Sequence, residues 1–277
     1  MVEQWPLKPL VVGSSPSWGT LIQMNLKNKN IVITGGADGI GKALAKRFLN
    51  EYPNSVHLID INPNVIHVAE LMGVKGYIVD VSDPEDIKST LNNIINETGT
   101  IDLFCSNAGI QEFGTLNISD ESWKKTWEVN VMAHIYAARV LIPHMLDNKD
   151  GYFLITVSAA GLLNMPGAMS YATTKHAALG LAENLSIMYG NKGIKVSVLC
   201  PQLVETNMVT SAGVLDEKHP LMKDGLLSPD QVADDTVEGI REEDFLILPH
   251  KEVLQYIQGK THNYDKWLAG IRRLIEE

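Results

Sequence analysis

Short β-branched runs alternate with segments of helical periodicity along most of the chain, and this alternation restricts the possible folds more than any other feature. The apolar runs lie at 31–34, 56–60, 76–79, 101–105, 152–157, 194–200 and 245–248. Helical patterns lie between them at 39–51, 63–72, 84–98, 119–147, 170–190 and 229–241, and a last amphipathic stretch covers 251–274. Apolar strands separated by helices are typical of a parallel sheet that helices cover on both faces. The pattern therefore predicts an α/β chain with a single doubly wound domain and a seven-stranded, mainly parallel sheet.

The first 23 residues lack this periodicity. They contain Trp5, Trp18 and several prolines, and their apolar run at 10–12 is too short for the core of a signal peptide. We interpret 1–23 as an irregular N-terminal arm and 24–277 as the domain. The alternative is an arm whose two tryptophans pack on a neighbouring subunit.

Composition excludes several classes of function. The formal net charge is −10 and the sequence pI is about 5.3, which argues against a nucleic-acid partner. No apolar stretch reaches the roughly 18 residues that a membrane-spanning helix needs. Cys105 and Cys200 each end an apolar run and lack the neighbouring ligands of a zinc site or a disulfide framework. We expect buried thiols in a cytoplasmic protein that binds no metal.

A glycine-rich loop follows the first predicted strand, and a helical pattern begins inside it. The loop reads Thr34-Gly35-Gly36-Ala37-Asp38-Gly39-Ile40-Gly41. Glycines let the backbone turn sharply and approach a pyrophosphate, whose charge free N–H groups and the helix dipole stabilise. The second predicted strand ends at Asp60, where a Rossmann-type dinucleotide fold places the carboxylate that binds a ribose hydroxyl. A helix cap ahead of Asn62 is the alternative role for Asp60.

The loop resembles the cofactor loop of the short-chain dehydrogenase/reductase family. Asp80-Val81 is similar to the family's adenine-contacting pair, Asn107-Ala108-Gly109 matches its Asn-Ala-Gly motif, and the resemblance spans about residues 29 to 207. It implies a cofactor-binding half at about 29–150 and a catalytic and substrate part at about 151–277. The cofactor-binding residues that it implies are Gly35, Asp38, Gly39, Ile40, Gly41, Asp60, Ile61, Asp80, Val81, Asn107, Ala108, Gly109, Tyr171, Lys175, Pro201, Val204 and Thr206.

The resemblance also implies a catalytic set of Asn130, Ser158, Tyr171 and Lys175. Tyr171 would exchange a proton with the substrate oxygen, which Ser158 would hydrogen-bond. Lys175 would hold the nicotinamide ribose, and Asn130 would position a water. A free phenol titrates near pH 10, so we expect the Lys175 ammonium and the oxidised nicotinamide to lower the pKa of Tyr171. An amide satisfied within its own helix is the alternative for Asn130.

The sequence departs from the family pattern at three places. Val157-Ser158 stands where the family usually has Ser-Ser, and the spacing to Tyr171 selects Ser158. Pro201-Gln202 replaces the usual Pro-Gly, so a side chain is expected in the nicotinamide or substrate pocket. The C-terminal end lacks the common Val-Asp-Gly-Gly sequence and carries Tyr256, Tyr264 and Trp267 instead.

Mostly apolar side chains are expected around the reacting carbon. The substrate residues that we predict are Gln111, Leu162, Met165, Gln202 and Met208, with Val214 and Leu215 farther along the same loop. Apolar walls with a few polar groups suit a hydrophobic ligand. No Lys or Arg occurs in these stretches before Lys218, so an anionic group would lack a fixed counter-ion. The predicted substrate is a mostly apolar secondary alcohol or its ketone.

The expected cofactor is NAD, because Asp38 and Asp60 would repel the 2′-phosphate of the phosphorylated cofactor. One alternative is an NADPH-dependent reductase of the ketoacyl type. The other is a non-catalytic dinucleotide-binding protein, which would be free to lose Ser158, Tyr171 or Lys175. A homodimer or homotetramer is expected as the assembly.

Overall fold

Seven parallel strands form one sheet in the order β3-β2-β1-β4-β5-β6-β7. This computed structural model describes residues 24–210 and 220–276, so the arm predicted at 1–23 lies outside it. The strands are β1 (Asn30–Thr34), β2 (Ser55–Asp60), β3 (Lys75–Ile78), β4 (Leu103–Ser106), β5 (Gly151–Thr156), β6 (Ile194–Leu199) and β7 (Leu246–Ile247). The predicted doubly wound α/β fold is confirmed. The order reverses between β1 and β4, and such switch points are where ligands bind in open α/β sheets.

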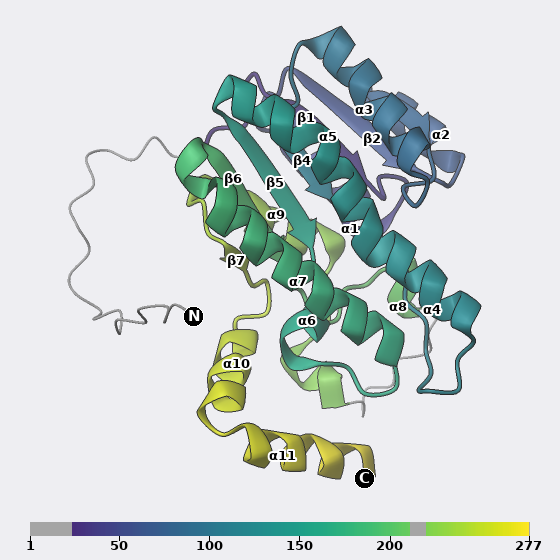
Figure 1. The fold of residues 1–277 in the computed structure, drawn as a ribbon, viewed down its shortest axis with the longest axis vertical. Helices are drawn as coiled ribbons and strands as arrows, with labels where there is room; N and C mark the ends of the chain where they lie inside the picture. Colours follow the sequence, from purple (N-terminus) through teal and green to yellow (C-terminus); the bar gives the residue numbers. More distant parts are fainter. Residues whose placement is uncertain (1–23, 211–219, 277) are drawn as a thin grey trace, which may run out of the picture.

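Helices cover both faces of the sheet, and each face has its own hydrophobic core. Helices α3 (Pro84–Thr98), α5 (Ala133–Asn148) and α7 (Met169–Tyr189) pack on one face. Helices α1 (Gly39–Leu49), α2 (Asn64–Met72) and α9 (Pro229–Arg241) pack on the other. In Figure 1, α5 and α7 cross in front of the strands and α9 lies behind them. Strands buried on both sides explain why their sequences are almost continuously apolar.

Two helix starts follow from their capping residues. The Asp83 side chain accepts hydrogen bonds from the backbone N–H groups of Glu85 and Asp86, at 2.8 and 3.2 Å, and α3 begins at the next residue. Ser228 and Gln231 form a reciprocal capping box at the start of α9. Each cap is followed by a proline, whose missing N–H costs nothing in the first turn.

Two predicted helical stretches are interrupted. The stretch at 119–147 contains α4 (Asp120–Trp127), a π-helical segment η1 (Glu128–Met132) and α5. The stretch at 251–274 is two helices, α10 (Glu252–His262) and α11 (Tyr264–Glu276). They separate at Asn263, which has an extended backbone and accepts a hydrogen bond from Lys266 N at 2.9 Å, as a helix cap does. Figure 1 shows α10 and α11 extending beyond the sheet, below the short helix α6 (Ala160–Leu163).

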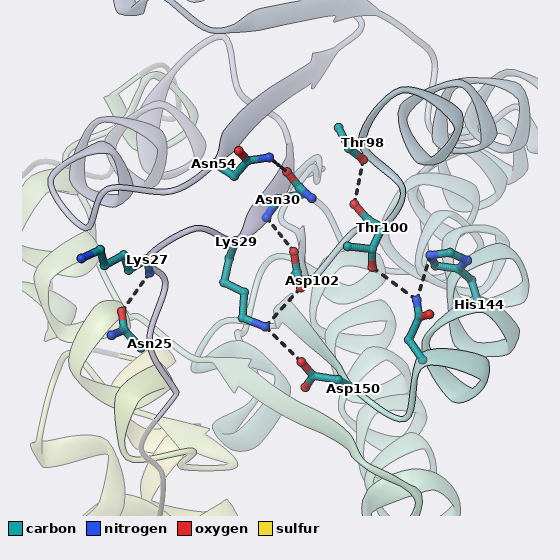
Figure 2. Close-up of polar contacts among 11 residues, drawn as sticks. Asn25, Lys27, Lys29, Asn30, Asn54, Thr98, Thr100, Asp102, His144 and Asp150 are labelled. Carbon is teal, nitrogen blue, oxygen red and sulfur yellow. Dashed lines mark hydrogen bonds and ion pairs between the residues drawn. The ribbon is translucent and has the colours of Figure 1, made fainter.

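Polar contacts join the strands at their amino ends, away from the switch-point edge (Figure 2). Lys29 Nζ lies 3.1 Å from Asp102 and 3.0 Å from Asp150, and the backbone N–H of Asn30 donates to Asp102 at 2.7 Å. The Asn54 side chain donates to that of Asn30 at 2.7 Å. These contacts hold the ends of β1, β2, β4 and β5 together, which leaves the carboxyl ends of the strands available for a ligand.

Both cysteines are buried and neither forms a disulfide, as expected. Cys105 lies within β4 and Cys200 directly follows β6. In the part of the chain that the structure describes, no helix is long and apolar enough to cross a bilayer.

Candidate active site

A cavity of about 1190 Å³ opens along the carboxyl edge of the sheet. It runs from Asp60 at the end of β2, past the glycine loop and Tyr171, to Trp267 on α11. The apolar part of its wall comes mainly from the segment between Ser158 and Tyr171, the segment after β6, and the C-terminal helices. One continuous cavity thus contains the predicted cofactor loop, the predicted catalytic side chains and an apolar region beyond them.

The glycine loop packs so tightly that a side chain cannot be accommodated at Gly41. A Cβ atom there would lie 2.1 Å from the carbonyl oxygen of Gly35. Gly39 has a φ of +53°, in the left-handed region that favours glycine, and α1 begins at this residue. Asp38 precedes the helix but its side chain makes no capping hydrogen bond. The first turn of α1 therefore presents backbone N–H groups to the cavity, as an anion-binding site requires.

A hydrogen-bond network around Asn107 joins three strands under the cavity. The Thr34 hydroxyl accepts from the backbone N–H groups of Asn107 and Ala108, at 2.9 and 3.0 Å. The Asn107 side chain donates to the Thr34 carbonyl at 3.0 Å and accepts from the Thr156 hydroxyl at 2.9 Å. In the sequence, Thr34 is recognisable only as the start of the glycine loop. The role of Thr156 could not be predicted, because pairing across the sheet is not visible in a motif.

Two carboxylates lie at the β2 end of the cavity. Asp60 accepts hydrogen bonds from the backbone N–H groups of Ala37, at 3.0 Å, and Asn62, at 2.9 Å. Asp60 therefore links the glycine loop to the turn after β2, and it also lines the cavity. Asp38 accepts from the side chain of Asn207 at 2.5 Å, which ties the segment after β6 to the glycine loop. This part of the cavity has negative charge at two positions.

Tyr171, Ser158 and Lys175 line the cavity together. Lys175 is 3% exposed, its Nζ donates to the Thr156 carbonyl at 2.8 Å, and it lies 5.6 Å from the centre of the Tyr171 ring. Ser158 has a φ of +88°, an unfavourable backbone conformation for a residue with a side chain. Such strain is concentrated at functional sites, where the surrounding structure holds it.

The pKa values of these groups follow from burial. Burial lowers the pKa of Lys175 to about 8, so its ammonium form is easily deprotonated compared with an exposed lysine. Burial also raises the pKa of Tyr171, and the hydrogen bond with Ser158 opposes this rise. Burial is the larger of these two effects on Tyr171, because it disfavours the charged phenolate. The expectation that the Lys175 ammonium and the oxidised nicotinamide together lower the pKa of Tyr171 stays a prediction.

Asn130 lies in the π-helical segment and is fully buried. Its side chain accepts from the backbone N–H of Ile110 at 2.9 Å and donates to the Ile110 carbonyl at 2.8 Å and the Thr174 hydroxyl at 3.1 Å. The alternative of an amide satisfied within its own helix is therefore wrong. Asn130 joins the segment after β4 to α7, which carries Tyr171 and Lys175. It does not line the cavity itself.

Several other predicted cofactor residues lie beside the cavity rather than on its wall. Gly41 backs the glycine loop, and Ile61 is 64% exposed next to Asp60. Asp80 accepts from the backbone N–H and hydroxyl of Ser82 at 2.9 and 2.6 Å, and Val81 is buried. The remaining predicted cofactor residues line the cavity: Gly35, Asp38, Gly39, Ile40, Asp60, Asn107, Ala108, Gly109, Tyr171, Lys175, Pro201, Val204 and Thr206.

Four of the five predicted substrate residues line the cavity, namely Gln111, Met165, Gln202 and Met208. Leu162 packs against the hydrophobic core rather than on the cavity wall, which its neighbour Leu163 lines, and its contact with a substrate stays a prediction. The oxygen of the Gln202 side chain is buried without a hydrogen-bond partner among the described residues. Val214 and Leu215 lie outside the described residues.

The structure adds wall residues that the motifs did not single out as substrate contacts. They are Met222, Lys223, Asp224, Tyr256, Trp267 and Ile271, from the segment before α9 and from the C-terminal helices. Lys223 lines the cavity. The expectation that an anionic group would lack a fixed counter-ion therefore holds only for the substrate stretches before Lys218. Lys223 is exposed and adjacent to Asp224. Chain folding brings these residues together, and their spacing in the sequence gives no signal of it.

The residues present fit a nicotinamide dinucleotide. The glycine loop leaves no room for side chains where a pyrophosphate would approach, and the start of α1 offers uncapped N–H groups. Asp60 could receive ribose hydroxyls at one end, and Lys175 could hold the second ribose at the other. These groups therefore suit a dinucleotide.

Comparisons with known proteins point in the same direction. The sequence model described as short chain dehydrogenase matches residues 29–214. The oxidoreductase UcpA of Escherichia coli (strain K12) is 31% identical over 193 residues, which cover 67% of this chain and 73% of that protein. Estradiol 17-beta-dehydrogenase 11 of Homo sapiens is 30% identical over 256 residues, 88% of this chain and 82% of that protein. A short chain dehydrogenase/reductase from Burkholderia phymatum, solved in complex with NAD, is 27% identical with a TM-score of 0.79, and the match covers 87% of this chain and 96% of that one.

Proposed function

This chain belongs to the short chain dehydrogenase family of oxidoreductases, and we propose that it interconverts a mostly apolar secondary alcohol and its ketone, with NAD as cofactor. The observation that carries this proposal is the continuity of the cavity. The same cavity is lined by the glycine loop, by Tyr171, Ser158 and Lys175, and by an apolar wall. A substrate that fills the apolar end would present its reacting carbon between Tyr171 and the cofactor.

The chain's own residues would manage the proton in this reaction. The bound nicotinamide supplies the hydride acceptor in the oxidative direction. Tyr171, in its phenolate form, would accept the proton of the substrate hydroxyl, and Ser158 would hydrogen-bond the same oxygen and orient it. Lys175, buried one helical turn from Tyr171, would hold the ribose and stabilise the phenolate when charged. In the reductive direction, Tyr171 returns the proton to the substrate oxygen.

Cofactor choice is the first prediction for this function. A 2′-phosphate at Asp60 would lie against a carboxylate, and like charges about 4 Å apart repel by roughly 4 kcal/mol at an effective dielectric near 20, before screening reduces it. Asp38 adds a second negative side chain at this end. We expect kcat/KM with NAD to exceed that with NADP by at least about tenfold. Asp60→Asn should narrow this ratio, and equal use of the two cofactors by the wild type would contradict the assignment.

Substrate class is the second prediction. Met165, Met208 and Met222 give the wall an adaptable apolar lining. The human relative is named for estradiol, a secondary alcohol on an apolar skeleton, which supports the same class here. We expect kcat/KM to rise along a series of secondary alcohols of increasing apolar size. If small hydroxy acids are the better substrates, the assignment of the apolar wall to the substrate is wrong, while dehydrogenase activity itself would stand.

The two alternatives predict other results. A ketoacyl-type reductase would prefer NADPH and an acyl substrate on a carrier. The carboxylates at the β2 end of the cavity disfavour the 2′-phosphate of NADPH. A non-catalytic dinucleotide-binding protein would bind NAD without turning over any alcohol. The homo-oligomeric assembly and the cytoplasmic location expected from the sequence stay predictions, and light scattering on the purified chain tests the first of them.

A further inference from the structure

The C-terminal helix α10 contacts α6 of the domain, and α11 packs against α10. Lys260, on α10, is the charged residue at this junction and is only 7% exposed. Its Nζ donates to the Leu162 carbonyl of α6 at 2.5 Å. The described partners of this ammonium are thus a carbonyl and aromatic rings, rather than a carboxylate.

The aromatic rings belong to the next helix. Lys260 Nζ lies 5.3 Å from the centre of the Tyr264 ring and 5.1 Å from that of the Trp267 ring, and the two rings meet edge to face at 6.2 Å. A cation over an aromatic face is attracted by the ring quadrupole, more strongly when it is desolvated. Lys260 therefore contacts both α6, which begins two residues after Ser158, and the face of α11 that carries Trp267.

That face of α11 reaches the cavity. Trp267 and Ile271, one helical turn apart, line its wall, and Tyr256 on α10 lines it as well. The Tyr256 hydroxyl donates to Asp224 at 2.9 Å, which joins α10 to the segment before α9. In Figure 1, α11 lies below α6, at the end of the molecule opposite α2 and α3. Residues of α10 and α11, helices that extend beyond the sheet, thus line one side of the cavity.

We propose that α10 and α11 form the far wall of the substrate pocket, that Trp267 determines specificity there, and that Lys260 is the residue that positions it. This inference rests on the proposed function and narrows its substrate class. The substrate has an apolar body that extends from the reacting carbon as far as Trp267 and Ile271. Small secondary alcohols can react at Tyr171 without reaching this wall.

The test compares two substrates in four proteins. The substrates are the smallest secondary alcohol that the wild type oxidises and a steroid-sized or long-chain one. Trp267→Ala should lower kcat/KM for the large alcohol by about tenfold, which corresponds to about 1.4 kcal/mol, and leave the small one unchanged. Lys260→Met keeps the length of the side chain but loses the charge, and should show the same size-selective fall. Lys266→Met is the matched control, because Lys266 lies exposed on α11.

A double variant separates positioning from general damage. If Lys260 acts through Trp267, adding Lys260→Met to Trp267→Ala should have little further effect on the large alcohol. Additive losses, or equal losses for both alcohols, would overturn the proposal. If Trp267→Ala does not fold, Trp267→Leu replaces it with the same expectations.

The proposed function can fail separately. If the wild type oxidises no alcohol with either cofactor, that function is wrong, and calorimetric binding of 2-propanol as the small alcohol and a steroid-sized secondary alcohol as the large one then tests the far wall. Weaker binding of only the large alcohol in Trp267→Ala and Lys260→Met would support the proposal that α10 and α11 form the far wall of the pocket. Unchanged binding of both alcohols would overturn it.

Discussion

Tyr171→Phe is expected to lose most of the turnover, on the order of a hundred- to ten-thousandfold, with cofactor affinity almost unchanged. Phenylalanine keeps the ring that packs beside Lys175, 5.6 Å from its Nζ, and removes only the hydroxyl that exchanges the proton. The measurement is kcat with a saturating secondary alcohol, together with the dissociation constant of NAD for both proteins. Substantial retained kcat would rule out Tyr171 as the acid–base group.

Tyr152→Phe is the matched control for that substitution. Tyr152 is another buried tyrosine, but it lies at the start of β5, outside the cavity wall, where its hydroxyl is 2.5 Å from that of Ser197. Loss of the Tyr152 hydroxyl should reduce the free energy of unfolding by roughly 1 kcal/mol and leave kcat near the wild-type value. A similar loss of kcat in both variants would show that removing any buried hydroxyl damages the enzyme.

Gly41→Ala is expected to weaken cofactor binding strongly. The added Cβ would lie 2.1 Å from the Gly35 carbonyl oxygen and 2.8 Å from the Asn107 side chain, so the loop must move. Overpacking of this kind typically costs about 1–3 kcal/mol, and the displaced loop is the one that faces the pyrophosphate. The dissociation constant of NAD should rise at least about a hundredfold, a change of roughly 2.7 kcal/mol.

Gly180→Ala tests whether the effect is specific to the loop. Gly180 lies within α7, and apart from its chain neighbours and the backbone of its own helix no atom lies within 4 Å of the position where its Cβ would stand. Alanine should stabilise the helix there by roughly 0.5–1 kcal/mol and leave NAD affinity unchanged. If Gly41→Ala binds NAD as the wild type does, the glycine loop does not hold the cofactor in the way we describe.

Sequence periodicity was sufficient for the sheet and for most helices, because burial on both faces demands apolar strands of a recognisable length. All seven strands lie where the apolar runs are, and Asp83 and Ser228 begin their helices as capping residues should. The glycine loop and the pair Tyr171 and Lys175 are also local patterns, since a loop conformation and a helix face depend on residues close in the chain.

Features that depend on contacts between distant segments were not predictable in this way. The π-helical segment around Asn130 leaves the helical pattern of the sequence intact, and only the bonds to Ile110 and Thr174 show what the segment does. Leu162 and Leu163 are both apolar, and the choice between core and cavity depends on the direction of one short turn. Asn263 gave a usable signal, a capping residue before a new apolar run, that the continuous pattern obscured.

Transfer of a labelled hydride tests the central claim most directly. A secondary alcohol that the enzyme accepts is prepared with deuterium on the carbinol carbon and incubated with NAD and the protein, and the reduced cofactor is examined by mass spectrometry. Our account predicts one deuterium per reduced cofactor in the wild type and greatly slowed transfer in Tyr171→Phe. Reduced cofactor without deuterium, or no reduction with any secondary alcohol, would contradict it.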